Sequence, residues 1–451
     1  MPHGLPPDLV LPEPRPLPAG FADRLAGIVG TDHVELDPAR RLEASRDHAW
    51  LSPVLTARLP DVVADLVVAP GSTAELAAVI GAAHEAGVPI TARGKGTGNY
   101  GQAVPLAAGM VVETDRMNAV RDVGDGWIDA GPGTSFVRLE AAARRHGQQL
   151  RVFPSTVSST IGGFLAGGAG GTGSIEHGFL WDGRTVASVD VLPCWDAPEV
   201  ATFLGDDALP YVHTYGTTGV VAGARVLTEP ARSWTAVLAG FDDVGSAGRA
   251  GLAVMALDPV PRNVSVDDAA LVGCLPADDA MPAGRASLRS IVATDAVDAH
   301  LEVVRSMGGR IEAVRPDGAG QLVSLSFNHV TLRAKRVRPA LCHLQVGGEP
   351  LVEAPDDVRA VLPGAMLHLD GRGPAPDVGF GGLLLSEFVD VDTLYEGVDR
   401  LRDIGVFVVD PHTWMLGGHG GVDELRSVAA HQDPAGLLNP GKIPPSVPVA
   451  G

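Results

Sequence analysis

Hydrophobic and polar positions change their period along the first part of the chain. Apolar side chains recur every three to four positions in residues 73–87, which predicts a helix. Ser72 or Thr73 is its expected N-cap, and a glycine ends it. A valine-rich run at 61–69 precedes this helix and a short apolar run at 88–91 follows it, and both predict strands. Together they indicate a strand–helix–strand unit of an α/β domain.

The same alternation continues to Pro230, so the chain up to that point is expected to be one mixed α/β unit. Of its strands, the last two are expected to pair. The further predicted elements are helices at 21–30 and 136–146 and strands at 109–114, 127–130, 185–192 and 219–227.

After Pro230 strands and helices still alternate, which suggests a second domain of ferredoxin-like character. The fold class predicted from the whole pattern is α+β. Residues 1–20 are rich in proline and are expected to form an extended arm. The predicted elements are strands at 234–241, 285–293, 322–327, 383–388 and 406–409, and helices at 242–257 (with Asp242 as N-cap), 295–307 and 393–405.

Composition and charge narrow the classes of partner. The chain has 451 residues and a net charge of −20, which argues against nucleic acid or an anionic membrane as a partner. Three cysteines, Cys194, Cys274 and Cys342, show no metal-type spacing. The sequence holds no apolar run of 18 residues and no secretory leader pattern, so no membrane span and a cytoplasmic location are expected.

Glycines gather in residues 153–178, here called the glycine-rich segment. It holds eight glycines in 26 residues, and such backbone is suited to approach a diphosphate closely. The alternative is a flexible linker, but Ile161, Phe164, Leu165 and Ile175 are spaced through the segment as apolar anchors.

Residues 93–98, RGKGTG, form a second candidate phosphate loop, here called the basic loop. A predicted strand leads into it, and it offers consecutive amides, a hydroxyl and two cations; the alternative is a tight turn with incidental charge. Residues 168–173 match G-x-G-x-x-G, but no clean strand precedes them and no helix is predicted after them. We therefore expect one extended dinucleotide between the two loops rather than a Rossmann site.

These motifs, taken in order, resemble the vanillyl-alcohol-oxidase/PCMH family of FAD-linked oxidases, and most of all its glycolate oxidase and D-lactate dehydrogenase-like branch. The resemblance covers about residues 60–230 and the last 20. It rests on Val68-Ala69-Pro70 before a helix, RGKGTG, PSTVSSTIGGFLAGGAGG, His177-Gly178, residues 216–221 and DPAGLLNPGKI.

The resemblance implies a PCMH-type FAD-binding domain of two α/β subdomains at 21–231 and a cap domain with an antiparallel sheet at 232–405. Residues 406–451 are expected to return to the flavin domain. Covalent relatives carry histidine where Thr97 stands, so FAD is expected to bind without a covalent link. The implied FAD contacts are Pro70, Arg93, Gly94, Lys95, Gly96, Thr97, Gly98, Asn99, Pro154, Ser155, Thr160, Ile161, Gly162, Gly163, Ala166, Gly168, Thr172, Gly173, Gly178, Val220, Asn439 and Lys442.

Residues 410–420 are the first candidate source of a catalytic base. This glycine-rich loop follows a predicted strand and holds His412, Trp414 and His419; the alternative is a surface loop with solvated histidines. In the similar branch a His-Gly pair near this position helps to ligate a metal, but Gly418 stands where that branch has glutamate. No metal is therefore predicted.

Residues 324–338 are the second candidate. His329 is expected on one face of a strand and Asn328 on the other, followed by basic residues of which Arg333 and Arg336 are candidates to bind a substrate carboxylate. The alternative is a solvated basic helix face. His177 and His343 are expected to be ordinary packing or surface histidines.

The resulting prediction is an FAD-dependent oxidoreductase that oxidises a hydroxyl or amine carbon of a small polar molecule. His419, His412 and His329 are the catalytic candidates, and Arg333, Arg336, Asn328 and Trp414 the substrate contacts. Oxygen or another acceptor is expected to reoxidise the flavin, and a homodimer is expected. Two rivals are a flavoenzyme for oxidative cyclisation or tailoring in secondary metabolism and a non-catalytic flavin-binding sensor or partner-binding module.

Overall fold

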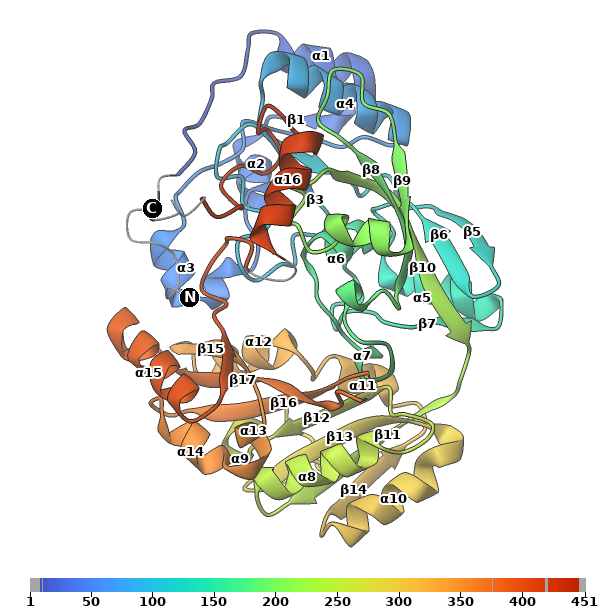
Figure 1. The fold of residues 1–451 in the computed structure, drawn as a ribbon, viewed down its shortest axis with the longest axis vertical. Helices are drawn as coiled ribbons and strands as arrows, with labels where there is room; N and C mark the ends of the chain where they lie inside the picture. The colour runs from blue at the N-terminus through green and yellow to red at the C-terminus, as the bar shows by residue number, and fades with distance from the viewer. Residues whose placement is uncertain (1–8, 10, 375, 418–420, 446–451) are drawn as a thin grey trace.

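The computed structural model describes residues 9, 11–374, 376–417 and 421–445. Three β-sheets organise them, with four, six and eight strands. The first two sheets and their helices form the upper half of the molecule, and the eight-stranded sheet forms the lower half, residues 234–409 (Figure 1). The predicted α+β class is therefore confirmed.

The four-stranded sheet contains the first strand–helix–strand unit. Its elements are α1 (Phe21–Val29), β1 (Val34–Glu35), β2 (Leu66–Val68), α4 (Thr73–Ala86), β3 (Ile90–Arg93) and β4 (Met110–Glu113). The strand order is β1-β2-β4-β3, with β2 and β3 parallel to β4. The Ser72 hydroxyl accepts the Glu75 amide (3.1 Å) and caps α4, and Gly87, at φ 65°, ends it. Leu76 and Val79 of α4 pack against Leu66 of the sheet.

The six-stranded sheet is antiparallel and has the order β5-β6-β10-β8-β9, with β7 beside β10. Phe136 and Leu139 of α5 pack on Ile128 of β6 in its core. Its elements are β5 (Val120–Gly124), β6 (Trp127–Ala130), α5 (Phe136–Arg145), β7 (Gln148–Leu150), α6 (Ile161–Gly167), α7 (Ser174–His177), β8 (Val186–Leu192), β9 (Ala201–Leu204) and β10 (Val220–Pro230).

The eight-stranded sheet is antiparallel throughout, in the order β14-β11-β13-β12-β16-β17-β15-β18. Its strands are β11 (Trp234–Phe241), β12 (Asn263–Asp267), β13 (Ala286–Ala293), β14 (Arg310–Arg315), β15 (Leu341–Gly347), β16 (Met366–Arg372), β17 (Gly379–Glu387) and β18 (Phe407–Val409). Its helices are α8 (Val244–Met255), α9 (Ala269–Val272), α10 (Val297–Ser306), α11 (Ala319–Val323), α12 (Asn328–Val337), α13 (Pro350–Glu353), α14 (Pro355–Ala360) and α15 (Val391–Asp403).

The two faces of this sheet differ in chemistry. Leu367 and Leu369 of β16 pack with α8, α13, α14 and α15 in an apolar core. Side chains alternate along a strand, so His368 and Asp370 lie on the opposite face. On that side α11 and α12 lie between the sheet and the upper half (Figure 1). The sheet thus presents buried polar groups toward the upper half.

The chain returns to the upper half after β18. Ile90 of β3 donates its amide to Leu437 O (2.8 Å) and accepts the Asn439 amide (2.7 Å), so residues 437–439 extend the four-stranded sheet. The remaining helices are α2 (Pro38–Ala44), α3 (Pro53–Arg58) and α16 (Val422–Gln432). Among the described residues, no helix has the length and apolar character needed to span a membrane.

Most predicted elements are present within a few residues, and β6 and β11 have the predicted bounds. The strand predicted at 322–327 is wrong, because α11 ends at Val323 and α12 begins at Asn328. The hydroxyls of Ser324 and Ser326 donate to carbonyls three residues earlier, at 2.9 Å each, and hold turns there.

Two further predictions about local structure need correction. The N-cap of α8 is Asp243, which accepts the Ser246 amide at 2.7 Å, and not Asp242. A helix, α6, lies inside the glycine-rich segment, and α7 follows residues 168–173 as a single turn. The sequence pattern also gave no strand for β12, β14, β15 or β16.

Candidate functional site

The basic loop and the start of α6 touch through their backbones. A Cβ atom on Gly94 would lie 2.2 Å from Thr160 Oγ1 and 3.5 Å from Gly163 Cα. A side chain at Gly94 would therefore displace the neighbouring loop. This close approach joins the two loops that the sequence analysis predicted to face one cofactor.

The glycine-rich segment is fixed at both ends of α6. The Thr160 hydroxyl accepts the Gly163 amide (3.3 Å), and the Gly162 amide donates to Pro132 O (2.9 Å). A Cβ on Gly171 would lie 2.1 Å from Phe153 O, so glycine is required there as well. These contacts exclude the flexible-linker alternative.

The cations of the basic loop are both engaged. Lys95 Nζ lies 2.5 Å from Asp115 Oδ2. The Arg93 guanidinium donates to Arg46 O (2.7 Å) and lies over Gly96. Burial lowers the pKa of Arg93, and its ion pair with Glu113 opposes this shift.

The C-terminal loop brings Asn439 and Lys442 to the same region. Asn439 Nδ2 donates to Gln102 O (2.9 Å) and Tyr215 O (2.8 Å). Lys442 is fully buried and donates to Gly101 O (2.6 Å). Burial lowers the pKa of Lys442 to about 7, although the buried carboxylate of Asp47 opposes this shift.

Tyr100, two residues after the basic loop, connects the two halves of the molecule. Its hydroxyl accepts from Asn328 Nδ2 (3.0 Å) and Gln345 Nε2 (2.8 Å) and lies 3.3 Å from His343 Nε2. Two amide donors occupy the oxygen lone pairs, so the phenolic proton is directed at His343. Burial raises the pKa of Tyr100 to about 12 and lowers that of His343 to about 3, which keeps both groups neutral.

His412 lies near this group and is almost fully buried. Its Nδ1 is 2.7 Å from Ser52 Oγ, and its Nε2 has no hydrogen-bond partner within the described part of the chain. Burial lowers the pKa of His412, against the attraction of Asp410. Trp414 is buried too, with its Cβ 3.1 Å from the position of a Cβ on Gly101.

The other candidates from residues 324–338 do not converge. His329 lies on α12, not on a strand, and its Nε2 is 2.9 Å from Thr156 Oγ1 of the glycine-rich segment. Burial lowers the pKa of His329. Arg333 donates to Ser324 O (2.9 Å) and so closes a turn of its own segment, while Arg336 is exposed. His419 lies outside the described residues.

A buried ionic network on the eight-stranded sheet supports Asn328 from behind. His368 Nδ1 is 2.6 Å from Asp267 Oδ1, and its Nε2 is 2.7 Å from Asp370 Oδ2. The Phe327 amide donates to the same oxygen of Asp370 (2.9 Å). Phe327 has φ 52°, a rare conformation for a bulky residue, and directly precedes Asn328. Arg289 completes the network through an ion pair with Asp267.

Several other predicted cofactor residues are placed as follows. Pro70 and Val220 are buried beside β2 and at the start of β10. Gly173 donates its amide to Arg262 O (2.8 Å), and a Cβ on Gly178 would lie 3.0 Å from Pro374, so both contact the lower half. Helix α6 and the residues around it contain Ile161, Ala166, Gly168 and Thr172, and the chain before it contains Pro154 and Ser155. The residues just before Tyr100 are Thr97, Gly98 and Asn99. Their contacts with a cofactor stay a prediction.

Four residues of this region were not predicted from the sequence: Asp47, Ser52, Tyr100 and Gln345. His343 was predicted to be a packing or surface histidine with no role in the site. Of these, only Tyr100 could have been predicted from the sequence, because it lies two residues after the basic loop. The others lie on segments with no recognised motif. The close approach of Gly94 to Thr160 and Gly163 is suited to binding an extended dinucleotide. The buried polar groups around Tyr100 are suited to lie beside the reactive ring of such a cofactor.

Comparison with known proteins agrees with this geometry. Residues 64–192 match the family model described as FAD binding domain. An uncharacterized FAD-linked oxidoreductase of Mycobacterium tuberculosis is 38% identical over 111 residues, 24% of either chain. A D-lactate dehydrogenase of Archaeoglobus fulgidus is 34% identical over 116 residues, 26% of either chain. These matches span about a quarter of the relatives' length.

Longer matches have lower identity. The glycolate oxidase subunit GlcD of Bacillus subtilis is 23% identical over 421 residues, 84% of this chain and 88% of that protein. A structure of alkyldihydroxyacetonephosphate synthase shares the fold, with a TM-score of 0.74 and 17% identity over 98% of this chain and 88% of that one. The resemblance predicted from the sequence is confirmed at this level: the chain contains an FAD-binding domain, it is similar to FAD-linked oxidoreductases such as those named above, and its cofactor is FAD.

Proposed function

We propose that this protein is an oxidase or dehydrogenase that oxidises the hydroxyl carbon of a small polar substrate, with an amine carbon as the alternative. Bound FAD supplies the acceptor for the hydride that leaves this carbon. FAD is held without a covalent link, since Thr97 stands where covalent relatives carry histidine. Two relatives named above, a D-lactate dehydrogenase and a glycolate oxidase subunit, carry the names of small hydroxy acids, which supports this substrate class.

The observation that carries the proposal is the set of neutral polar groups around Tyr100. Asn328, Gln345 and His343 come from the lower half and meet Tyr100 of the upper half within 3.3 Å. The segment that follows the basic loop and the lower half thus share one hydrogen-bonded centre. Such a centre can orient a hydroxyl group and exclude bulk water from it.

We assign the base to His412. When its Nδ1–H donates to Ser52 Oγ, the lone pair of Nε2 is free to accept the hydroxyl proton of the substrate. The lowered pKa keeps this imidazole neutral at physiological pH. His329, bonded to Thr156, and His419 are the alternatives for the base, with Arg333, Arg336 and Trp414 as further candidate contacts.

Lys442 is assigned to electrostatic stabilisation beside the cofactor. Its ammonium group is buried, bonded to Gly101 O and paired at longer range with Asp47. A buried positive charge favours the anion that forms when the flavin ring is reduced.

The wider context of the reaction concerns the electron acceptor, the partners and the domain division. Oxygen or another small acceptor reoxidises the cofactor, and the net charge of −20 disfavours nucleic acid as a partner. We propose the division 21–231, 232–405 and 406–451, in which the third segment first adds strand β18 to the sheet of the second and then returns to the flavin domain. We also propose a cytoplasmic homodimer.

Anaerobic reduction tests the proposal. The purified protein should show flavin bands near about 370 and 450 nm. Small hydroxy acids, polyols and aromatic alcohols are then added one at a time without oxygen. At least one should bleach the 450 nm band within seconds to minutes. A protein that retains FAD but is bleached by none of them would overturn the alcohol-oxidation proposal and favour the cyclisation or sensor rivals.

A further inference from the structure

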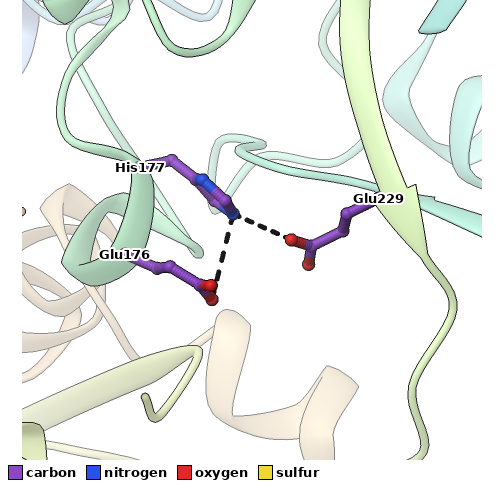
Figure 2. A group of neighbouring side chains, drawn as sticks. All are labelled: Glu176, His177 and Glu229. Carbon is purple, nitrogen blue, oxygen red and sulfur yellow. Dashed lines mark hydrogen bonds and ion pairs between the residues drawn. The ribbon is translucent and has the colours of Figure 1, made fainter. Parts of the chain in front are cut away.

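Three side chains at the junction of the two halves converge away from the site described above. His177 Nε2 lies 3.0 Å from Glu229 Oε2 and 3.9 Å from Glu176 Oε2 (Figure 2). One ligand atom of each residue lies within 4.8 Å of the others. Within the described residues this is the one such group of histidine, cysteine or carboxylate side chains. The sequence predicted no metal here and treated His177 as an ordinary histidine.

The carboxylate of Glu229 is held in position by Gln149. Gln149 Oε1 accepts from Trp234 Nε1 (2.9 Å) and Arg144 Nη2 (2.9 Å), which fixes the orientation of its amide group. Gln149 Nε2 therefore points at Glu229 and donates to Oε1 at 2.5 Å. The other oxygen, Oε2, is left to face His177. An outer-shell hydrogen bond of this kind is what orients a metal-binding carboxylate.

The group carries the charge that a divalent cation requires. Two of its three members, Glu176 and Glu229, are carboxylates, which can balance the charge of a divalent cation. The side chains of His177 and Glu229 are 12% and 13% exposed, while that of Glu176 is 34% exposed. Two ligands are thus preformed and partly desolvated, and the third has access to solvent for ion entry.

The spacing suits a small ion. Ligand bonds to Zn²⁺ are about 2.0–2.2 Å for histidine nitrogen and carboxylate oxygen. Ligand atoms on one tetrahedral ion are therefore about 3.3–3.6 Å apart. The 3.0 and 3.9 Å separations lie on either side of this range, so an ion would move Glu229 and His177 apart, and Glu176 toward His177, by only a few tenths of an ångström each.

The location gives such an ion a structural role. Glu176 and His177 lie on α7, and Glu229 lies near the end of β10, the last strand before the chain enters the lower half. Ser174 of α7 accepts the Gly373 amide (3.2 Å), just after β16, and the Gly173 amide donates to Arg262 O. α7 is therefore one of the contacts through which the upper half holds the lower sheet.

We propose that Glu176, His177 and Glu229 bind one divalent transition-metal ion, with water in the fourth position, and that this ion fastens α7 to the end of β10. The chemistry of one imidazole and two carboxylates is suited to Zn²⁺. The site is independent of the oxidation chemistry.

Calorimetric titration of the FAD-loaded, chelator-treated protein with ZnCl₂ tests this inference. One ion per chain should bind, and the thermal unfolding midpoint should rise with it. His177→Gln and Glu229→Gln should each weaken binding by more than about 100-fold, because loss of a ligand exceeds the 10–100-fold effect of an outer-shell partner. Flavin absorbance reports that each variant is folded.

His431→Gln is the matched control, since His431 is an exposed histidine on α16, outside the Glu176, His177 and Glu229 group. Its stoichiometry and affinity should equal those of the wild type. Co²⁺ provides a second readout, because its ligand-field absorption should appear in the control and be lost in His177→Gln. Absence of stoichiometric Zn²⁺ binding to the wild type, or equal binding to His177→Gln, would show that the three residues form only a hydrogen-bonded ion pair.

Discussion

The two halves of the molecule contribute to the site by different physical means. The upper half uses backbone: Gly94, Thr160 and Gly163 approach so closely that a single methyl group would not fit. The lower half uses side chains: Asn328, His343 and Gln345 reach across to Tyr100. A long cofactor needs close backbone over its whole length, whereas a small substrate needs only a few oriented polar groups.

The polar face of the lower sheet also contains buried charged side chains. Asp267, His368, Asp370 and Arg289 are buried on the sheet face that points at the site. Buried charges are tolerated only where each has a partner of opposite charge. The stability of the fold is therefore sensitive to the loss of one residue of this network. The comparison predicts that single substitutions in this buried ionic network act through stability, and those at the close glycine contacts of the upper half through cofactor affinity.

The largest effect is expected for Asp267→Asn. It removes the charge shared by Arg289 and His368 and leaves a buried cation without its counter-ion. Unfolding in urea should show a loss of about 3–5 kcal/mol. Asp423→Asn, which breaks the exposed pair with Arg426, should cost less than about 1 kcal/mol. Equal losses would contradict the distinction.

The pH dependence of stability should report on His368. Burial lowers its pKa, but Asp370 and Asp267 outweigh this and raise the pKa of His368 to about 9, from an ordinary value of 6.5. A raised pKa stabilises the fold fully below pH 6.5, and that stabilisation is lost as the pH rises through about 9. The loss should be of order 3 kcal/mol.

Urea midpoints measured between pH 6 and 10 check this expectation. His368→Gln, which cannot titrate there, should be less stable than the wild type at pH 6, and the gap should narrow toward pH 10. The charged groups that face His368 are Asp267, Asp370 and Arg289. Parallel curves for the two proteins would show that His368 does not carry the pH dependence.

Tyr100→Phe tests the link between the halves. It removes the hydroxyl that Asn328, Gln345 and His343 share but keeps the ring. We expect the rate of flavin reduction by substrate to fall about 100-fold, with FAD content unchanged, because positioning and proton handling contribute on this scale. Stopped-flow absorbance measures this rate. Tyr211→Phe is the control: the Tyr211 hydroxyl accepts from Gln432 Nε2 (2.9 Å), within the upper half. The rate of flavin reduction in this variant should be within about twofold of the wild-type rate.

Gly94→Ala is the smallest of the four expected effects and sharpens the role of the upper half. Its methyl group would meet Thr160 Oγ1 at 2.2 Å and separate the basic loop from α6. FAD affinity, measured by fluorescence titration of the apoprotein, should weaken about tenfold, or about 1.4 kcal/mol. In Gly27→Ala the new methyl group meets nothing within 4 Å, and this helix substitution should stabilise the protein by about 0.5–1 kcal/mol without affecting FAD.

The sequence was informative wherever local chemistry leaves few alternatives. The cap of α4 at Ser72, the basic loop and the glycine-rich segment could all be placed, because caps and close approaches demand particular residue types. Residues 322–327 show the opposite case, since six alternating residues fit a strand and two turns equally well. Strands β15 and β16 escaped notice because their polar side chains, such as His343 and His368, hide the apolar alternation.

The sequence by itself indicated a dinucleotide between two glycine-rich loops, because glycine lets backbone approach a diphosphate closely, and the resemblance of its motifs to a known family identified that cofactor as FAD. Only the tertiary structure decided which polar groups meet at Tyr100, since its partners Asn328, His343 and Gln345 are distant from it along the chain and carry no motif. It also separated Arg336, which is exposed, from Asn328 on the same helix. Side-chain convergence depends on how the sheet docks on the upper half, and that docking is a property of the packed fold rather than of any local pattern.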